Sequence, residues 1–64
     1  MTAIELFEIA QEHRRNKRFG DAINIYKEVI DSSDATEELR RRAEVSIDLI
    51  QEINGFVNID LMNP

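Results

Sequence analysis

Apolar residues recur at helical spacing in three successive stretches of the chain. Residues 3–15 carry one apolar stripe, residues 19–31 carry a wider one, and residues 35–54 carry the widest. Each stripe follows steps of about 100° per residue, the angular period of an amphipathic helix. Thr2 and Glu5 fit a capping box at the start of the first stretch. The pattern predicts an all-α fold of three helices.

The stripes also predict which side chains meet in the core. In the first helix these are Leu6, Ile9, Ala10 and His13. In the second helix they are Phe19, Ala22, Ile23, Ile25, Tyr26, Val29 and Ile30. A polar turn at residues 16–18 joins these two helices, and Asn16 is the residue there best suited to a left-handed conformation. The first two helices are therefore expected to form an antiparallel hairpin.

The third helix is expected to be the longest, with a polar arc on one side and a broad apolar arc on the other. Its candidate N-caps are Ser33, Asp34 and Thr36. Two i,i+4 pairs stand in the favourable order, Glu37 with Arg41 and Glu38 with Arg42. Its solvated arc is expected to hold Arg40, Arg41, Glu44, Asp48, Gln51 and Glu52. The opposite apolar arc, interrupted only by Arg42 and Ser46, is broader than a single docking face requires.

This surplus of apolar surface predicts self-association. Ala43, Ile47 and Ile50 are expected to cover the hairpin. The residues that are then left over are Val45, Leu49 and Ile53, followed by Phe56 and Val57 in a short extended tail at residues 55–64. Burying each such side chain contributes roughly 1.5–3 kcal/mol, so a homodimer through the third helix and the tail is expected. The competing arrangement is a closed monomer in which the tail folds back over Val45 and Leu49.

Composition excludes several classes of function. Sixty-four residues make a single domain, 1–64, in which the hairpin spans 1–34 and the third helix 35–54. With no cysteine and one histidine, neither a disulfide nor a histidine-rich metal site is available, and no cofactor is expected. His13 lies on the apolar stripe, where a packed and hydrogen-bonded ring is expected. No nucleophile–base arrangement can be assembled, so we predict a non-enzyme.

The apolar runs are too short for a membrane span or the core of a signal peptide, so a cytoplasmic location is expected. The net charge of −5 argues against general nucleic-acid binding. Seven of the eight basic residues nevertheless fall in two clusters, at residues 14–18 and 40–42. The first cluster either complements the negative end of a helix or forms a seat for an acidic partner. A small nucleic-acid-associated protein that uses both clusters is the alternative function.

The first 34 residues resemble one tetratricopeptide repeat, whose pattern is W-x2-L-G-x2-Y, then A-x3-F, then P. The matching positions are Leu6, Ile9, Ala10, His13, Ala22 and Tyr26, with Asp34 in the place of the proline. His13 replaces the aromatic residue, and Lys17 stands where a turn glycine is common. The third helix resembles the start of a next repeat or a capping helix.

The resemblance implies a non-catalytic module that binds a protein or peptide partner through the outer positions of the first helix. Carried over by position, these are Ile4, Phe7, Gln11, Arg14 and Arg15. Ile4 and Phe7 lie off the predicted core stripe, so they are expected to form an exposed apolar pair. Family members that clamp a terminal carboxylate have a basic residue where Phe7 stands, which argues against a full clamp here. A purely structural, self-assembling subunit is the remaining alternative.

Overall fold

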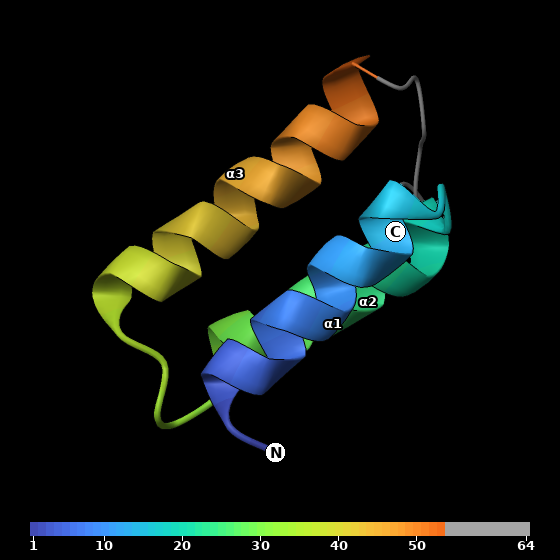
Figure 1. Cartoon of the computed structure of the whole chain (residues 1–64). Helices are drawn as coiled ribbons and strands as arrows, with labels where there is room; N and C mark the ends of the chain where they lie inside the picture. Colours follow the sequence, from blue (N-terminus) through green and yellow to red (C-terminus); the bar gives the residue numbers. More distant parts are fainter. Residues whose placement is uncertain (54–64) are drawn as a thin grey trace, which may run out of the picture.

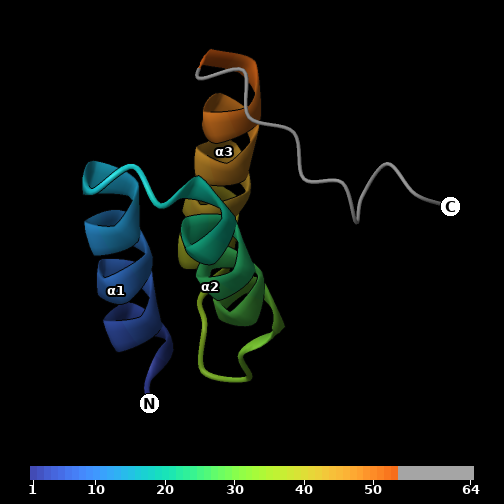
Figure 2. The ribbon, with the colours of Figure 1, turned by 90° about the vertical axis from the view of Figure 1, so that its right-hand side faces the viewer.

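The computed structural model describes the backbone of residues 1–53 and the side chains of residues 1–52. Within them the chain forms three α-helices, α1 (Ala3–Arg15), α2 (Phe19–Asp31) and α3 (Glu37–Ile53), and no strand (Figure 1). The helix α2 packs against both α1 and α3. Figure 2 shows α1 as a separate column beside the other two helices. The predicted all-α fold is confirmed, and the predicted extended tail lies outside the described residues.

The capping box at the start of α1 is formed as predicted. The Glu5 amide donates to the Thr2 hydroxyl at 3.2 Å, and the Thr2 amide donates to the Glu5 carboxylate at 2.9 Å. The bond from the Thr2 amide, and a second one from the Thr2 hydroxyl to the same carboxylate, lower the pKa of Glu5 below its ordinary value of 4.5. Two amides that a helix end leaves without partners are thereby satisfied.

The turn between α1 and α2 differs from the prediction. Lys17, not Asn16, adopts the left-handed conformation, with φ of 61°. The amides of Arg18 and Lys17 donate to the carbonyls of His13 and Arg14, at 2.8 and 3.0 Å, which is the hydrogen-bond pattern of a Schellman motif. Asn16 is the C-cap residue, and its side-chain amide donates to the Glu12 carbonyl at 3.0 Å. The sign of φ therefore reverses one residue after the position that the sequence suggested.

The start of α3 also differs, because the helix begins at Glu37 rather than at residue 35. Of the three candidate caps, Thr36 is the one used: the Leu39 amide donates to its hydroxyl at 3.1 Å. Asp34 instead accepts a hydrogen bond from the Ala3 amide at 3.1 Å, and a second one from the Ser32 hydroxyl. The loop after α2 is thus tied to the first turn of α1.

The core lies along α2, between the other two helices. Its largest fully buried side chains are Tyr26, Ile23, Ile50 and Val29. The predicted inner face of α3 is confirmed, since Ala43, Ile47 and Ile50 are buried in the same cluster. Fully buried alanines on all three helices, Ala10, Ala22 and Ala43, keep the core narrow.

The buried face of α1 is the main correction to the predicted core. The buried residues are Ala3, Phe7 and Ala10, whereas Leu6, Ile9 and His13 are only half-buried. Phe7 is 6% exposed, so the expected exposed pair of Ile4 and Phe7 does not exist. Phe7 turns inward because its ring packs edge-on against Tyr26, with 5.6 Å between ring centroids.

Candidate interaction groove

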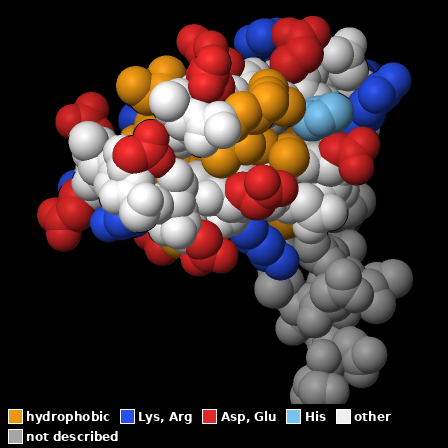
Figure 3. Space-filling model, turned by 90° about the horizontal axis from the view of Figure 1, so that it is seen from below, with side chains coloured by type: hydrophobic (Ala, Val, Ile, Leu, Met, Phe, Trp, Pro, Cys, Tyr) orange, Lys and Arg blue, Asp and Glu red, His pale blue; other side chains and the backbone are white. Residues whose placement is uncertain are grey.

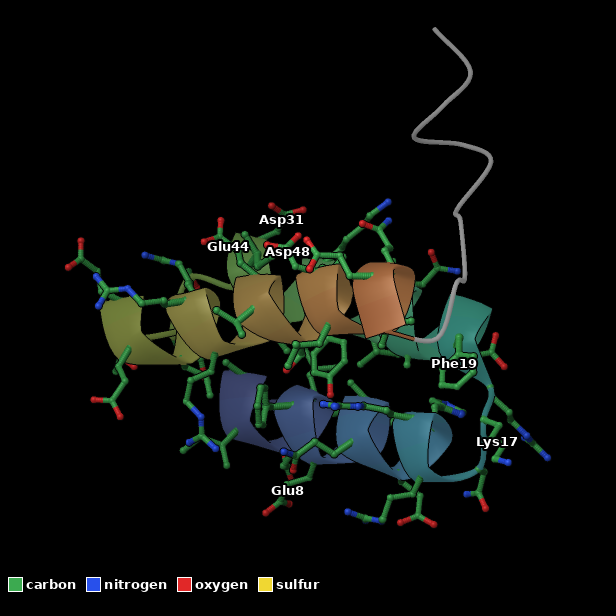
Figure 4. The ribbon with its side chains drawn as sticks, turned by 90° about the horizontal axis from the view of Figure 1, so that it is seen from above. Glu8, Lys17, Phe19, Asp31, Glu44 and Asp48 are labelled. Carbon is green, nitrogen blue, oxygen red and sulfur yellow. The ribbon has the colours of Figure 1, made fainter. Side chains whose placement is uncertain are left out.

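Two hollows lie between α1 and α3 and share three lining residues, Phe7, Gln11 and Arg42. The first, of about 390 Å³, is also lined by Ile4, Glu8, Asp34, Thr36, Glu38 and Leu39. The second, of about 350 Å³, is also lined by Arg14, Arg41, Val45 and Ser46. Because the shared residues join them, we treat the two hollows as one feature, the α1–α3 groove. In Figure 4 the two helices lie alongside each other, with side chains between them.

One aromatic side chain, that of Phe7, lies at the middle of the α1–α3 groove. The Arg42 guanidinium lies over the Phe7 ring, 5.1 Å from its centroid, and the Phe7 ring also contacts the buried ring of Tyr26. A cation over an aromatic face contributes about 0.5–1 kcal/mol at exposed sites. This contact replaces the predicted pairing of Arg42 with Glu38, for which no ion pair is present in the described residues. The hydroxyl of Tyr26 is buried and has no hydrogen-bond partner among the described residues.

Four of the five residues predicted to bind a partner line the groove: Ile4, Phe7, Gln11 and Arg14. Ile4 is 64% exposed and so offers an apolar surface at the rim. Arg15 lies elsewhere, because its guanidinium forms an ion pair with Glu12 at 2.6 Å. Arg15 also lowers the pKa of Glu12 through this hydrogen bond. The structure thus separates Arg14, at the groove, from Arg15, outside it.

The wall that α3 contributes was missed by sequence reasoning. Glu38, Leu39, Arg41 and Arg42 line the groove from that helix, together with Val45 and Ser46. A signal was present, because Arg42 and Ser46 are the two polar residues that interrupt the apolar arc of α3. Ser46 is buried, and its hydroxyl donates to the Arg42 carbonyl at 2.8 Å. On α3, Arg42 and Ser46 line the groove, next to the apolar residues that pack in the core, Ala43, Ile47 and Ile50.

The arginines at residues 40–42 do not form one basic surface. Arg40 was expected on the solvated arc, but it is half-buried and donates to the carbonyls of Ile30 and Ser32, at 3.2 and 3.3 Å. It therefore caps the end of α2. Arg42 lies over Phe7, and Arg41 lines the groove. Other members of the predicted solvated arc, Glu44 and Asp48, point away from α1 as expected (Figure 4).

The residues predicted to mediate self-association are only partly described. Val45 is 49% exposed and Leu49 is half-buried. The side chain of Ile53, and Phe56 and Val57 entirely, lie outside the described residues. Homodimer formation stays a prediction. Since Val45 also lines the groove, a dimer through α3 and a peptide in the groove would compete for the same surface.

Hydrophobic side chains also reach the surface elsewhere. On the face seen from below, they gather in one patch bordered by acidic and basic side chains (Figure 3). Among the half-buried apolar residues, Leu6, Phe19, Ile25, Ile30 and Leu39 pack against the core. A surface of this kind can take part in a contact with another protein.

Within the described residues, no group of three or more His, Cys, Asp or Glu side chains is placed to hold a metal ion. His13 is half-buried, and the hydrogen bond predicted for its ring is not present among these residues. None of the described helices is long and apolar enough to cross a membrane.

Comparisons with protein-family models, curated proteins and solved structures give no match for this chain.

Proposed function

We propose that this protein is a non-catalytic interaction module that binds a peptide segment of a partner protein in the α1–α3 groove. The observation that carries the proposal is the groove itself, which has an aromatic floor at Phe7 and polar side chains on both walls. Recognition sites of this kind combine apolar area with a few polar groups that fix orientation.

The resemblance to the tetratricopeptide repeat supports the same surface. In that family the peptide-binding surface comes mainly from the first helix of each repeat. On this proposal α1 corresponds to the first helix of a repeat, and α3 to the first helix of a following repeat. We therefore propose a single repeat followed by a capping helix, whose two first-position helices enclose the groove.

A selection from a displayed library of random peptides tests this function. Gln11→Trp fills the groove at a residue common to both hollows, and Asn24→Trp places the same side chain on an exposed position of α2. Peptides selected on the wild-type protein should bind Asn24→Trp unchanged. They should bind Gln11→Trp at least about tenfold more weakly, a difference of about 1.4 kcal/mol. Circular dichroism checks that both variants remain helical.

Two results would reject the proposal. One is a selection that yields no peptide specific for the wild-type protein. The other is a set of peptides that bind both tryptophan variants equally, since these peptides would use another surface.

Self-association through α3 is a second candidate function, favoured by the exposed side chain of Val45. Light scattering across a concentration series gives the solution mass. A dimer that dissociates in Val45→Glu, but not in the control Asn24→Glu, supports it. A wild-type protein that stays monomeric at millimolar concentration excludes it.

A nucleic-acid-associated role is the weaker alternative, because Arg40 and Arg42 are already engaged within the chain. Retention on DNA or RNA that decreases steeply with salt would be its signature.

A further inference from the structure

The charged side chains of the α1–α3 groove are sorted by sign along its length. The hollow near the start of α1 is lined by three carboxylates, from Glu8, Asp34 and Glu38, and by one guanidinium group, that of the shared Arg42. The hollow near the end of α1 is lined by three guanidinium groups, from Arg14, Arg41 and Arg42, and by no carboxylate. The groove thus has an acidic end and a basic end, in a chain whose net charge is −5.

Some of these charges already have structural partners. Asp34 accepts hydrogen bonds from the Ala3 amide and the Ser32 hydroxyl, and Arg42 lies over Phe7. The remaining four side chains form no hydrogen bond or ion pair within the described residues: Glu8, Glu38, Arg14 and Arg41. Each end of the groove therefore has two charges available to a ligand.

The two available carboxylates differ in placement. Glu38 is an exposed residue in the first turn of α3. Glu8 lies on the outer rim, and its side chain points away from α3 in Figure 4. We expect Glu38 to contribute the larger share of the selectivity at the acidic end.

The distance between the ends fits a short peptide. The available charges on α1, Glu8 and Arg14, line opposite ends, and the six residue steps between them along the helix span about 9 Å, at 1.5 Å per residue. An extended chain advances about 3.3 Å per residue, so about three residues cover this length. Apolar side chains accompany the charges along the groove: Phe7 lines both hollows, Leu39 lines the acidic one and Val45 the basic one.

We propose that the groove selects an extended peptide with an apolar centre, a positive side chain at one end and a negative side chain at the other. This inference rests on the proposed function and specifies its ligand. The positive end lies against Glu38 and Glu8, and the negative end lies against Arg14 and Arg41. A uniformly basic peptide, which the net charge alone would favour, places like charges together at the basic end.

Binding of four synthetic peptides tests the proposal, measured by titration into the ¹⁵N-labelled protein at low salt. Two are bipolar, Lys-Lys-Ala-Leu-Ala-Glu-Glu and its reversed sequence, because the charges fit either chain direction. Two are uniform, with lysine or glutamate at all four charged positions, and all have blocked termini. The tighter of the bipolar peptides should bind about tenfold more tightly than either uniform peptide, and this margin should shrink as salt rises.

Charge reversal gives the sharper result, because it predicts a gain of binding. Arg14→Glu with Arg41→Glu leaves Arg42 against five carboxylates in the lining of the groove, so the all-lysine peptide should become the tightest ligand. Glu8→Lys with Glu38→Lys should transfer that preference to the all-glutamate peptide. Arg18→Glu with Lys27→Glu changes the net charge as the first pair does, but neither residue lines the groove, so the bipolar preference should persist.

The outcomes separate this inference from the proposed function. If peptides from the library depend on Gln11 but bind regardless of charge order, the groove is a peptide site and the inference is wrong. If the all-lysine peptide binds the wild-type protein most tightly, net charge governs binding and the inference is also wrong. If none of the four peptides binds at millimolar concentration, the bipolar ligand is rejected, and the library selection alone decides on the groove.

Discussion

The seam between α1 and α2 and the seam between α1 and α3 use the same helix in opposite ways. Toward α2, α1 contributes the fully buried Ala10, which shares a core cluster with Ala22. Toward α3, the next residue, Gln11, lines a groove together with long charged side chains. Small residues let two helices approach until water is excluded, whereas long polar residues hold them apart. Two adjacent residues of α1 therefore belong to different regions: Ala10 to the core and Gln11 to the candidate binding surface.

Leucine substitutions at these adjacent positions should have very different effects. Ala10→Leu forces extra volume into the closed seam and should lower the free energy of unfolding by about 1–3 kcal/mol. Gln11→Leu places the same side chain in the open groove and should change it by no more than about 0.5 kcal/mol. Thermal unfolding followed by circular dichroism measures both, at about 4–8 °C per kcal/mol in a domain of this size. Equal losses would show that the groove is as tightly packed as the core.

The turn that closes the α1–α2 seam contains a strained residue, and relieving it should stabilise the protein. Lys17 has φ of 61°, which glycine adopts without steric conflict. Lys17→Gly should raise the free energy of unfolding by about 1 kcal/mol. Asn16→Gly is the matched control and should give no gain, because it removes the side-chain hydrogen bond to Glu12. Denaturant unfolding distinguishes this result from the reverse, which would place the left-handed residue at Asn16.

The difference between Lys17 and Asn16 shows where sequence reasoning reached its limit. The bounds of α1 and α2 were predicted correctly because capping boxes and polar turns are local features. The left-handed position was wrong by one residue, since it depends on which carbonyls the turning chain reaches. The partner of Asp34 could not be predicted at all, because the Ala3 amide is 31 residues away.

The groove was predicted only in part, because its lining also depends on contacts between residues far apart in the sequence. The resemblance to the tetratricopeptide repeat assigned Ile4, Gln11 and Arg14 to a partner-binding surface, and all three line the groove. Phe7 was assigned to the wrong side because α1 has apolar residues over much of its circumference. Its burial depends on Tyr26, a contact between helices that periodicity within α1 does not contain. The wall from α3 depends on how that helix packs on α2, which is equally non-local.

The contact between the loop after α2 and the start of α1 should make the stability of the fold depend on pH, because it is formed by the carboxylate of Asp34. Hydrogen bonds from Ser32 and from the Ala3 amide lower the pKa of Asp34 below its ordinary value of 3.8. A carboxylate whose pKa is lower in the folded state stabilises the fold above its unfolded pKa. That stabilisation is lost as pH decreases through 3.8 towards the folded value. The effect should be modest because the side chain is exposed.

Asp34→Asn should therefore reduce the loss of stability of the wild-type protein between about pH 5 and pH 2. The control is Glu28→Gln, which removes an exposed carboxylate that forms no hydrogen bond in the described residues. It should leave the acid dependence close to that of the wild type. Urea unfolding at several pH values measures both variants. An acid dependence that Asp34→Asn leaves unchanged would assign the loss to other carboxylates, such as Glu5 in the capping box.

The smallest expected effect concerns Tyr26, which connects the closed core to the floor of the groove. Its hydroxyl is buried without a hydrogen-bond partner among the described residues, and its ring contacts Phe7. Burying a polar group without a partner is unfavourable, whereas replacing it with an apolar group of the same shape is close to neutral or stabilising. Tyr26→Phe should thus leave the free energy of unfolding unchanged or raise it by less than about 1 kcal/mol.

A loss of about 1 kcal/mol or more in Tyr26→Phe would instead mean that the hydroxyl has a partner, such as a buried water molecule. The two outcomes lead to different descriptions of the groove. A neutral substitution means that the interior beneath Phe7 is dry, so the floor is a purely apolar surface and the charged ends alone orient a ligand. A destabilising substitution means that the Tyr26 hydroxyl has a hydrogen-bond partner, so the interior beneath Phe7 holds a satisfied polar group. Urea unfolding of the two proteins, compared at the same pH, decides between them.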